Sequence, residues 1–352
     1  MNNPQRRKTR AIGVGKLVLG QGNPIRVQSM TSTKTSDIAA TCKQIKRLVN
    51  AGCEIVRVAV PDLKALKALP GIKKYCPVPL VADIHFQAAY AIAAVAVGVD
   101  KIRINPGNIG GLERFKAVIR CCKNKGVAMR IGVNSGSVEK ELLEKHSGPT
   151  PKAMVESAVH YLSICESLRY NQLVVSIKAT HVMDAVSANR DLSEKMDYPI
   201  HLGITEAGGK YYGSIKSATG LGALLVDGIG DTIRVSLTGD PVNEIPVAYD
   251  ILKATGARIV SPEIISCPTC GRLQYNMEKA AAEIEKMVRH IKKPLRIAVM
   301  GCVVNGPGEA READIALAGG KGAALLFIRG KKIKQVGEKE MVREVVRIVE
   351  EW

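Results

Sequence analysis

Short apolar runs rich in Val and Ile alternate with longer stretches of helical periodicity over roughly the first 250 residues of the chain. The apolar runs predict strands at 25–30, 55–60, 80–85, 101–105, 129–134, 173–179, 201–206 and 232–237. The stretches between them predict helices at 37–51, 63–69, 87–97 and 111–125, a longer helical region up to 168, and helices at 183–196, 214–225 and 242–254. Strands that read as continuous apolar runs are buried on both faces, as in a parallel sheet covered by helices.

The number of strand–helix units favours one α/β fold. Eight units match a (β/α)8 barrel of the TIM type. A doubly wound open sheet is the alternative, and such a sheet usually carries a glycine-rich phosphate turn after its first strand. Here that turn reads Ser-Met-Thr-Ser at 29–32, so we expect the barrel. The segment 11–19 predicts a small hairpin that can plug the bottom of the barrel.

The pattern changes near residue 256, where a smaller α+β unit is expected. It has predicted helices at 277–291 and 338–350 and predicted strands at 295–299, 314–317, 323–328 and 332–336. About 90 residues are enough for a separate core. We therefore expect two domains, a barrel with its hairpin at 1–258 and an α+β domain at 259–352.

Composition and charge narrow the function classes. The 352 residues include 51 Lys and Arg against 33 Asp and Glu, a net charge of +18, which points to an anionic partner. Nucleic acid is disfavoured because only 4% of the residues are aromatic and the basic residues are spread along the chain. No apolar run of about 18 residues and no secretory signal are present, so we expect a cytoplasmic protein without a membrane span.

Cations interrupt six of the eight predicted strands: Arg26, Arg57, Arg103, Arg130, Lys178 and Arg234. A buried charge needs a partner, and in a barrel it is tolerable only towards the axis and near the mouth, where active sites of this fold lie. Several cations there would bind a polyphosphate. Internal pairing is the alternative, with Asp83, Glu206 and Asp231 as partners for about three of the six. Polar residues recur at the strand ends: Gln28, His85, Asn105, Asn134, Ser176, Thr205 and Ser236.

Nine cysteines, an odd number, indicate thiols in a reducing compartment rather than a disulfide framework. Cys267 and Cys270 form a CxxC, which by itself fits zinc, a redox disulfide, half of an iron–sulfur site, or chance. A third thiol, Cys302, follows a predicted strand in a glycine-rich loop, and a carboxylate lies close behind it. Three soft ligands beside a carboxylate suit an iron–sulfur cluster with one labile position. The other six are expected to be small buried residues: Cys42, Cys53, Cys76, Cys121, Cys122 and Cys165.

Seven stretches together resemble the bacterial 4-hydroxy-3-methylbut-2-en-1-yl diphosphate synthases, iron–sulfur enzymes of the methylerythritol phosphate route to isoprenoids. They are Pro-Ile-Arg-Val-Gln-Ser-Met-Thr at 24–31, Ala-Asp-Ile-His-Phe at 82–86, Arg-Ile-Asn-Pro-Gly-Asn at 103–108, Arg-Ile-Gly-Val-Asn at 130–134, Thr-Glu-Ala-Gly at 205–208, Cys-Pro-Thr-Cys-Gly-Arg at 267–272 and Gly-Cys-Val-Val-Asn-Gly-Pro-Gly-Glu at 301–309. The last stretch is highly specific, and the resemblance runs in order from about residue 20 to the end of the chain.

The resemblance implies a reaction and its residues. Two electrons and loss of water would convert 2-C-methyl-D-erythritol 2,4-cyclodiphosphate into 4-hydroxy-3-methylbut-2-enyl diphosphate, with a ferredoxin or flavodoxin as electron donor. A [4Fe-4S] cluster would be held by Cys267, Cys270, Cys302 and Glu309. Substrate would be bound by Arg57, Arg103, Arg130, Asn134, Lys178, Ser236 and Asn305, with Glu206 as the candidate proton donor.

The linker between the domains predicts a homodimer. The last barrel helix delivers the chain to the face opposite the mouth, and the dozen or so residues before Cys267 reach at most ~40 Å. A head-to-tail dimer, also implied by the resemblance, lets each cluster serve the partner's barrel, with the active site between subunits. Two rival hypotheses remain: a nucleic-acid binder with a structural metal site, and a phosphate-binding barrel of the pterin-synthase type with zinc at the cysteines.

Overall fold

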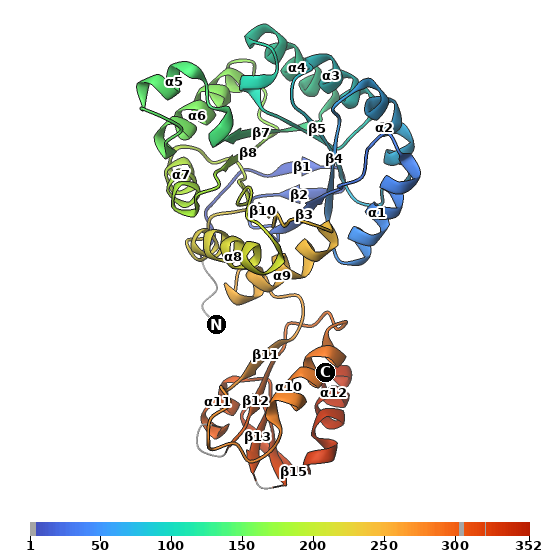
Figure 1. The fold of residues 1–352 in the computed structure, drawn as a ribbon, viewed down its shortest axis with the longest axis vertical. Coiled ribbons are helices and arrows are strands. Elements are labelled where there is room, and N and C mark those ends of the chain that lie inside the picture. Colours follow the sequence, from blue (N-terminus) through green and yellow to red (C-terminus); the bar gives the residue numbers. More distant parts are fainter. Residues whose placement is uncertain (1–4, 303–305, 321) are drawn as a thin grey trace. The chain divides into compact units, whose positions relative to one another are not determined.

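The computed structural model describes residues 5–302, 306–320 and 322–352. The chain folds into two compact units, Met1–Arg258 and Ile259–Trp352 (Figure 1). Each unit has its own apolar core. In the described part of the chain, no helix is both long and apolar enough to cross a membrane.

The first unit is a parallel barrel. Its eight strands are β3 (Arg26–Met30), β4 (Ile55–Ala59), β5 (Leu80–Ile84), β6 (Lys101–Ile104), β7 (Ala128–Asn134), β8 (Leu173–Lys178), β9 (His201–Leu202) and β10 (Thr232–Ile233). They form one sheet in the order β8-β7-β6-β5-β4-β3-β10-β9, and a parallel bridge between Val175 and Ile200 brings the two ends of the sheet together. The expected barrel is therefore confirmed, and the open-sheet alternative is wrong.

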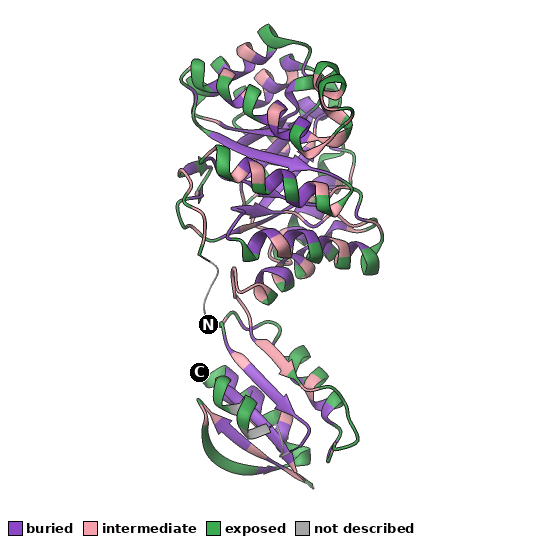
Figure 2. Cartoon of the chain, turned by 90° about the vertical axis from the view of Figure 1, so that its left-hand side faces the viewer, coloured by how far each residue is buried: buried purple, intermediate pink, exposed green. Residues whose placement is uncertain are grey.

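Helices surround the barrel, and their exposed faces turn away from the buried strands (Figures 1 and 2). They are α1 (Ile38–Asn50), α2 (Leu63–Tyr75), α3 (Ala88–Val97), α4 (Leu112–Lys125), α5 (Lys140–Lys145), α6 (Pro151–Ser167), α7 (Val182–Lys195), α8 (Lys210–Val226) and α9 (Glu244–Ala254). Short 3-10 turns occur at η1 (Pro106–Asn108), η2 (Ser135–Ser137) and η3 (Pro241–Asn243). Local sequence sets several helix ends: Asp37 and Asp62 accept backbone N–H groups at the starts of α1 and α2, and glycines 98 and 126 end α3 and α4 with positive φ.

The expected hairpin is present as β1 (Ile12–Val14) and β2 (Leu17–Leu19). Its buried side chains Ile12, Val14 and Leu19 pack against Ile55, Val81, Ala128 and Val174. Those four residues lie at or near the first positions of β4, β5, β7 and β8. The hairpin therefore closes the amino-terminal end of the barrel with an apolar layer, and the polar interior opens at the carboxyl ends of the strands.

The second unit is a five-stranded sheet with the strand order β11-β12-β13-β14-β15. Its elements are β11 (Glu263–Ser266), α10 (Met277–Val288), β12 (Arg296–Met300), α11 (Gly306–Glu312), β13 (Ile315–Gly320), β14 (Ala323–Ile328), β15 (Lys331–Gly337), η4 (Glu338–Glu340) and α12 (Met341–Glu351). Helices α10 and α12 share one core with the sheet. The first three strands are parallel, so β11 and β12 release the chain at the same edge.

Five elements differ from the sequence-based expectation. The long helical region before 168 is broken into η2, α5 and α6. Helix α2 continues past Pro70 to Tyr75, because Leu69 and Ile72 are both fully buried and hold it against the barrel. Strands β9 and β10 are only two residues long. Strand β11 was not expected, because its residues were predicted to belong to the linker between the domains.

Candidate active site

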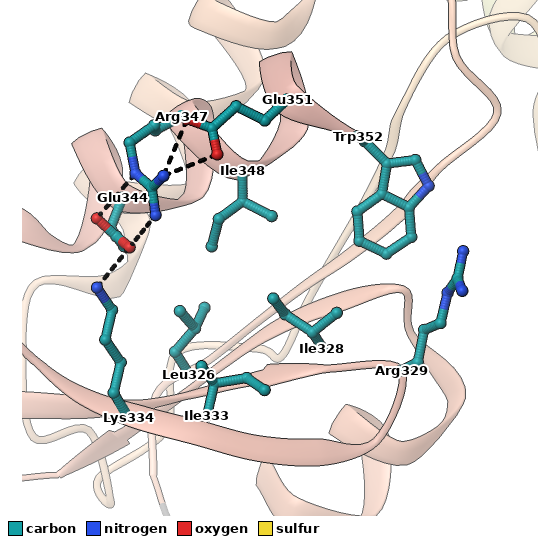
Figure 3. A pocket seen from close by; sticks show the side chains of 10 residues that line it. All are labelled: Leu326, Ile328, Arg329, Ile333, Lys334, Glu344, Arg347, Ile348, Glu351 and Trp352. Atoms are coloured by element: carbon teal, nitrogen blue, oxygen red, sulfur yellow. Dashed lines mark hydrogen bonds and ion pairs between the residues drawn. The ribbon is translucent and has the colours of Figure 1, made fainter.

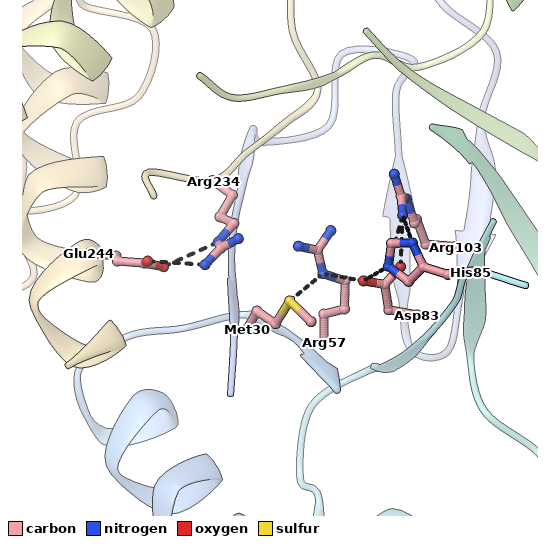
Figure 4. A network of polar contacts seen from close by, with 7 residues as sticks. All are labelled: Met30, Arg57, Asp83, His85, Arg103, Arg234 and Glu244. Carbon is pink, nitrogen blue, oxygen red and sulfur yellow. Dashed lines mark hydrogen bonds and ion pairs between the residues drawn. The ribbon is translucent and has the colours of Figure 1, made fainter. Parts of the chain in front are cut away.

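A cluster of positive side chains lies inside the carboxyl-terminal half of the barrel. Asp83 on β5 is its central acid: Arg57 Nε lies 3.8 Å from Asp83 Oδ2, and Arg103 Nη1 lies 3.3 Å from Asp83 Oδ1 (Figure 4). His85 Nε2 approaches the same carboxylate at 3.3 Å. Burial alone would raise the pKa of Asp83, but Arg57, His85 and Arg103 hold that pKa far below its ordinary value. One carboxylate thus serves two guanidinium groups.

A second buried carboxylate, Glu244, organises the loop after β10. It accepts a hydrogen bond from Arg234 Nη2 at 3.1 Å (Figure 4). It also accepts from Ser29 Oγ at 2.8 Å and from the backbone N–H of Leu237 at 3.2 Å. Its side chain is 2% exposed. Glu244 therefore fixes both Arg234 and the loop that carries Ser236. Sequence reasoning missed it, because a glutamate in the first turn of a helix is an ordinary finding.

Two further cations, Arg130 and Lys178, form no ion pair within the described residues and are almost fully buried. Burial lowers the pKa of each, and the neighbouring arginines lower it further. Arg57 is affected in the same way: burial, only partly offset by Asp83, lowers its pKa to about 10. This part of the barrel therefore carries more positive charge than its carboxylates balance, as an anion-binding site requires.

Two glycines make room for these side chains. A Cβ on Gly132 of β7 would lie 2.7 Å from Arg103 Nε. A Cβ on Gly203, directly after β9, would lie 2.5 Å from Lys178 Nζ and 2.8 Å from the carbonyl oxygen of Arg234. No real side chain tolerates such contacts. The absence of Cβ at both positions lets the cations occupy the barrel interior.

The remaining strand cation, Arg26, and two of the expected acids, Glu206 and Asp231, have other partners. Arg26 lies at the start of β3 and pairs with Glu54 at 2.7 Å, away from the carboxyl ends of the strands. The expectation that Glu206 and Asp231 pair with strand cations was wrong. Glu206 accepts a hydrogen bond from Thr180 Oγ1 at 3.0 Å, and Asp231 pairs with Arg6 of the amino-terminal segment at 2.7 Å.

The polar residues expected at the site lie in the loops and strand ends of the same half of the barrel. With its amide oriented to satisfy both groups, Asn134 accepts a hydrogen bond from Arg103 Nη2 at 3.2 Å. Ser236 is half-buried in the loop that Glu244 anchors. Glu206 is exposed after β9 with φ of 51°, a left-handed conformation that is costly for a glutamate and recurs at functional sites.

The three candidate cluster cysteines belong to the second unit. Cys267 follows β11 and Cys302 follows β12, so both leave the sheet at the same edge. The backbone N–H of Gly301 donates to Cys267 Sγ at 3.3 Å. Cys270 is exposed, Cys267 is half-buried and Cys302 is buried. The backbone amide and then the side chain of Arg272 lower the pKa of the Cys270 thiol, which favours the thiolate that binds iron.

The donor set fits an iron–sulfur cluster. All three thiols act electrostatically on Arg272, which places them in one neighbourhood. Each cysteine of an iron–sulfur cluster binds a different iron atom, so the ligands of a cluster stand further apart than those of a single metal ion. Glu309 is exposed on α11. Asn305, expected to reach the substrate, lies outside the described residues.

The other six thiols form no disulfide, and the expected burial is confirmed for three of them, Cys53, Cys122 and Cys165, whereas Cys42, Cys76 and Cys121 are half-buried. Burial raises the pKa of the Cys53 and Cys122 thiols to about 12. A pocket of about 560 Å³ in the second unit lies between β14, β15 and α12 (Figure 3). Among its charged groups, Glu344 pairs with Lys334 and Arg347, and none of the expected site residues lines the pocket.

Comparison with known proteins decides the family. The model described as the GcpE TIM-barrel domain matches residues 9–249, and the model described as the GcpE protein C-terminal domain matches residues 263–351. The chain belongs to the GcpE family. A Symbiobacterium thermophilum relative is 52% identical over 99% of this chain and 94% of its own length, and a Bacillus subtilis relative is 50% identical over 98% and 92%. Both are named 4-hydroxy-3-methylbut-2-en-1-yl diphosphate synthase (flavodoxin).

These relatives confirm the family and the iron–sulfur oxidoreductase class expected for this GcpE chain. Among solved structures, dihydropteroate synthase from Stenotrophomonas maltophilia covers 70% of this chain and 97% of its own with a TM-score of 0.52 at 13% identity. The Yersinia pestis dihydropteroate synthase covers 70% and 99% with a TM-score of 0.51, also at 13% identity. At such identity the likeness shows the barrel fold alone, and the pterin-synthase hypothesis is outweighed by the full-length relatives.

Proposed function

We propose that the barrel interior is the substrate site for the reaction of this family, the two-electron reductive ring opening of 2-C-methyl-D-erythritol 2,4-cyclodiphosphate to 4-hydroxy-3-methylbut-2-enyl diphosphate. The observation that carries the assignment is the excess of cations: among the described residues, five basic side chains stand against two carboxylates, Asp83 and Glu244, which pair with only three of them. An oligoanion supplies the missing negative charge, and arginine pairs with phosphate oxygens through two parallel hydrogen bonds.

In this proposal the cations of the barrel interior contribute to substrate binding in different ways. Arg130 and Lys178 bind the diphosphate directly, since neither has a carboxylate partner among the described residues. Arg57 and Arg103 keep donor groups free beyond their contacts with Asp83, and that carboxylate holds both in place. Asn134 and Ser236 add neutral hydrogen bonds at the rim, and Asn305 is proposed to contact the substrate from the cluster domain.

Cys267, Cys270, Cys302 and Glu309 are the proposed ligands of a [4Fe-4S] cluster. The three thiolates would hold the cluster, and the harder carboxylate oxygen of Glu309 would be the weaker, more labile ligand. A cluster held there would pass on the donor's two electrons one at a time and would offer a Lewis-acidic iron for the substrate oxygen. Gly301 supports the cysteines by donating its N–H to the Cys267 sulfur.

Glu206 is the proposed proton donor to the departing hydroxyl group. Thr180 donates to its Oε2 at 3.0 Å, which leaves Oε1 to carry a proton towards the substrate. Its left-handed backbone is held by the loop between β9 and α8. General acid catalysis at this position makes water the leaving group in place of hydroxide.

The electron donor is proposed to be a flavodoxin, as the names of the relatives state for those proteins. The cytoplasmic location, the absence of nucleic-acid and membrane partners, and the homodimer stay predictions.

The dimer proposal rests on the linker between the two domains. Helix α9 runs back to the amino-terminal face of the barrel, and residues 255–262, which lie between α9 and β11, reach at most ~30 Å. Subunits bearing Cys302→Ser and Lys178→Ala, each inactive alone, should regain activity on mixing if sites form between subunits. Exchange of subunits without activity would refute that arrangement.

The substrate site is tested by Arg130→Ala and Lys178→Ala. Each should weaken binding of the cyclodiphosphate by roughly 10- to 150-fold, because each removes a charge-assisted contact of about 1.5–3 kcal/mol. Arg26→Ala is the matched control, since that strand cation pairs with Glu54 at the start of β3. Iron and sulfide analysis and the absorption near 400 nm after anaerobic purification should match the unmodified protein in all three variants. Unchanged affinity in both test variants would make the barrel cations structural pairs.

A further inference from the structure

A sixth basic side chain, Lys101, lies deeper in the barrel than the cations of the substrate site. It is the first residue of β6 and is level with Val81 of β5 and Ala128 of β7, two residues of the apolar layer under the hairpin. Residues level with one another in a parallel sheet point to the same side, so Lys101 points into the barrel. Arg103, two residues later on β6 and on the same side of the sheet, belongs to the proposed substrate site.

The amino group of Lys101 has no hydrogen-bond partner among the described residues. The Lys101 side chain is fully buried, with 0% of the residue exposed. Other orphaned polar atoms lie in the same buried interior: both amide atoms of Gln28, Nε and Nη1 of Arg130, and Nε2 of His201. A charged lysine in such surroundings is left without compensation, which folded proteins avoid.

The ionisable groups of the barrel interior give Lys101 no negative partner. Arg57, Arg130 and His201 interact with it electrostatically. The strands and their ends also contribute Asp83, Arg103, Lys178 and Arg234. Asp83 is the only acid among them, and it already pairs with Arg57 and Arg103. Glu244, the other buried acid, already pairs with Arg234. Burial, then Arg130 and Arg57, lower the pKa of Lys101 well below its ordinary range.

We propose that Lys101 is uncharged in the free protein and takes up one proton from solvent when an anionic ligand binds above it, and so becomes part of the anion site. The proton forms a bond with the Nζ lone pair, and the ligand's negative charge compensates the new ammonium group. This rests on the proposed function, since it needs the ligand's phosphates in the same half of the barrel.

The linked proton is measured by calorimetry on the oxidised holoenzyme without reductant. The cyclodiphosphate is titrated at one pH in two buffers of different ionisation enthalpy. Each phosphorus of this ligand carries one ester link and one anhydride link and keeps a single, strongly acidic oxygen, so the ligand has no proton to exchange near neutral pH. Lys101→Met should reduce proton uptake by about one per site. Lys67→Met, an exposed helical lysine, is the control and should leave the uptake unchanged.

A second measurement needs no ligand. An unfolded lysine holds its proton up to pH of about 10.4, whereas buried Lys101 sheds it at lower pH, so the unfolded chain binds the extra proton and the folded protein is destabilised below that pH. Lys101→Met should therefore raise the thermal midpoint at pH 7, and this advantage should disappear as the pH rises towards 10.

The outcomes separate the two proposals. Tight binding with equal proton uptake in wild type and Lys101→Met would overturn the role of Lys101 and leave the substrate site intact. A midpoint that falls in Lys101→Met by the same amount at every pH would also overturn it, because it would reveal a charged, partnered lysine. Absence of binding in the wild-type holoenzyme would refute the substrate site, and the ligand-linked proton with it.

Discussion

The space beside Gly203 makes the sharpest prediction about the substrate site. An alanine there places its methyl group 2.5 Å from Lys178 Nζ and 2.8 Å from the carbonyl oxygen of Arg234. Ordinary contacts are ~3.4–4 Å, so the ammonium must move by about 1 Å or more. The backbone carbonyl of Arg234 cannot swing aside as a flexible side chain does. Gly203→Ala should therefore displace Lys178 while leaving its charge in the protein.

The magnitude has two parts. Forcing one extra methyl group into a packed interior costs typically about 1–3 kcal/mol of folding stability. Misplacing the ammonium removes one charge-assisted contact with the ligand, worth about 1.5–3 kcal/mol, which corresponds to roughly 10- to 150-fold weaker binding. Urea unfolding measures the first part, and calorimetric titration with the cyclodiphosphate measures the second.

Gly222→Ala is the matched control. It adds the same methyl group to the interior of α8, where the nearest atom, Cγ2 of Thr255, is 3.9 Å away. This variant should be more stable by about 0.5–1 kcal/mol, because alanine favours the helix, and its ligand affinity should not change. If folded Gly203→Ala binds the cyclodiphosphate as tightly as wild type, Lys178 does not contact the ligand and the reasoning fails.

Four further variants test other parts of the molecule. Cys302→Ser should lose iron, sulfide and turnover together, because a hydroxyl group does not replace a thiolate on iron, whereas Glu309→Ala should lose more activity than iron; full reductase activity with stoichiometric zinc and no iron would contradict both. Glu244→Gln should cost about 3 kcal/mol in urea unfolding and weaken substrate binding, since it leaves Arg234 without its counter-charge and loosens the loop of Ser236; equal stability would show that Arg234 has another partner. The depressed pKa of Asp83 stabilises the fold above the unfolded value of about 3.9 and this stabilisation is lost as the pH falls below it, so the stability gap between wild type and Asp83→Asn should be constant from pH 7 to about 5 and shrink below pH ~4; a gap that grows in acid would contradict the network.

Much of the barrel was predictable because its strands are buried on both faces and read as apolar runs. The cations inside them were also visible, since Arg57, Arg103 and Arg130 interrupt such runs at positions that alternate towards the axis. Chain periodicity does not reveal which acid meets which base. Asp83 was a correct expectation because it lies on a strand, but Glu244 lies on a helix and reaches the cations only through the closure of the barrel.

The short strands β9, β10 and β11 were not predicted correctly from the sequence, for a different reason. β9 and β10 end early, where Gly203 and Arg234 begin the loops around Lys178, so the apolar pattern continues after the ladder has stopped. β11 has only four residues, too few for a period to stand out from a linker. The proposed cluster ligands could be selected from the sequence because thiol chemistry follows from residue type, whereas the place of Arg272 beside Cys270 depends on the fold.

The hairpin that plugs the barrel has an electrostatic consequence. The apolar layer beneath the buried cations has a low dielectric constant. The electric field of the positive interior therefore extends into solvent mainly through the open mouth of the barrel. The barrel then works as a one-ended funnel for anions, which approach from solvent along the barrel axis and meet rising potential as they enter. Capture of a doubly charged ligand should consequently be fast and strongly slowed by salt, even though the cations that bind it are nearly hidden from solvent.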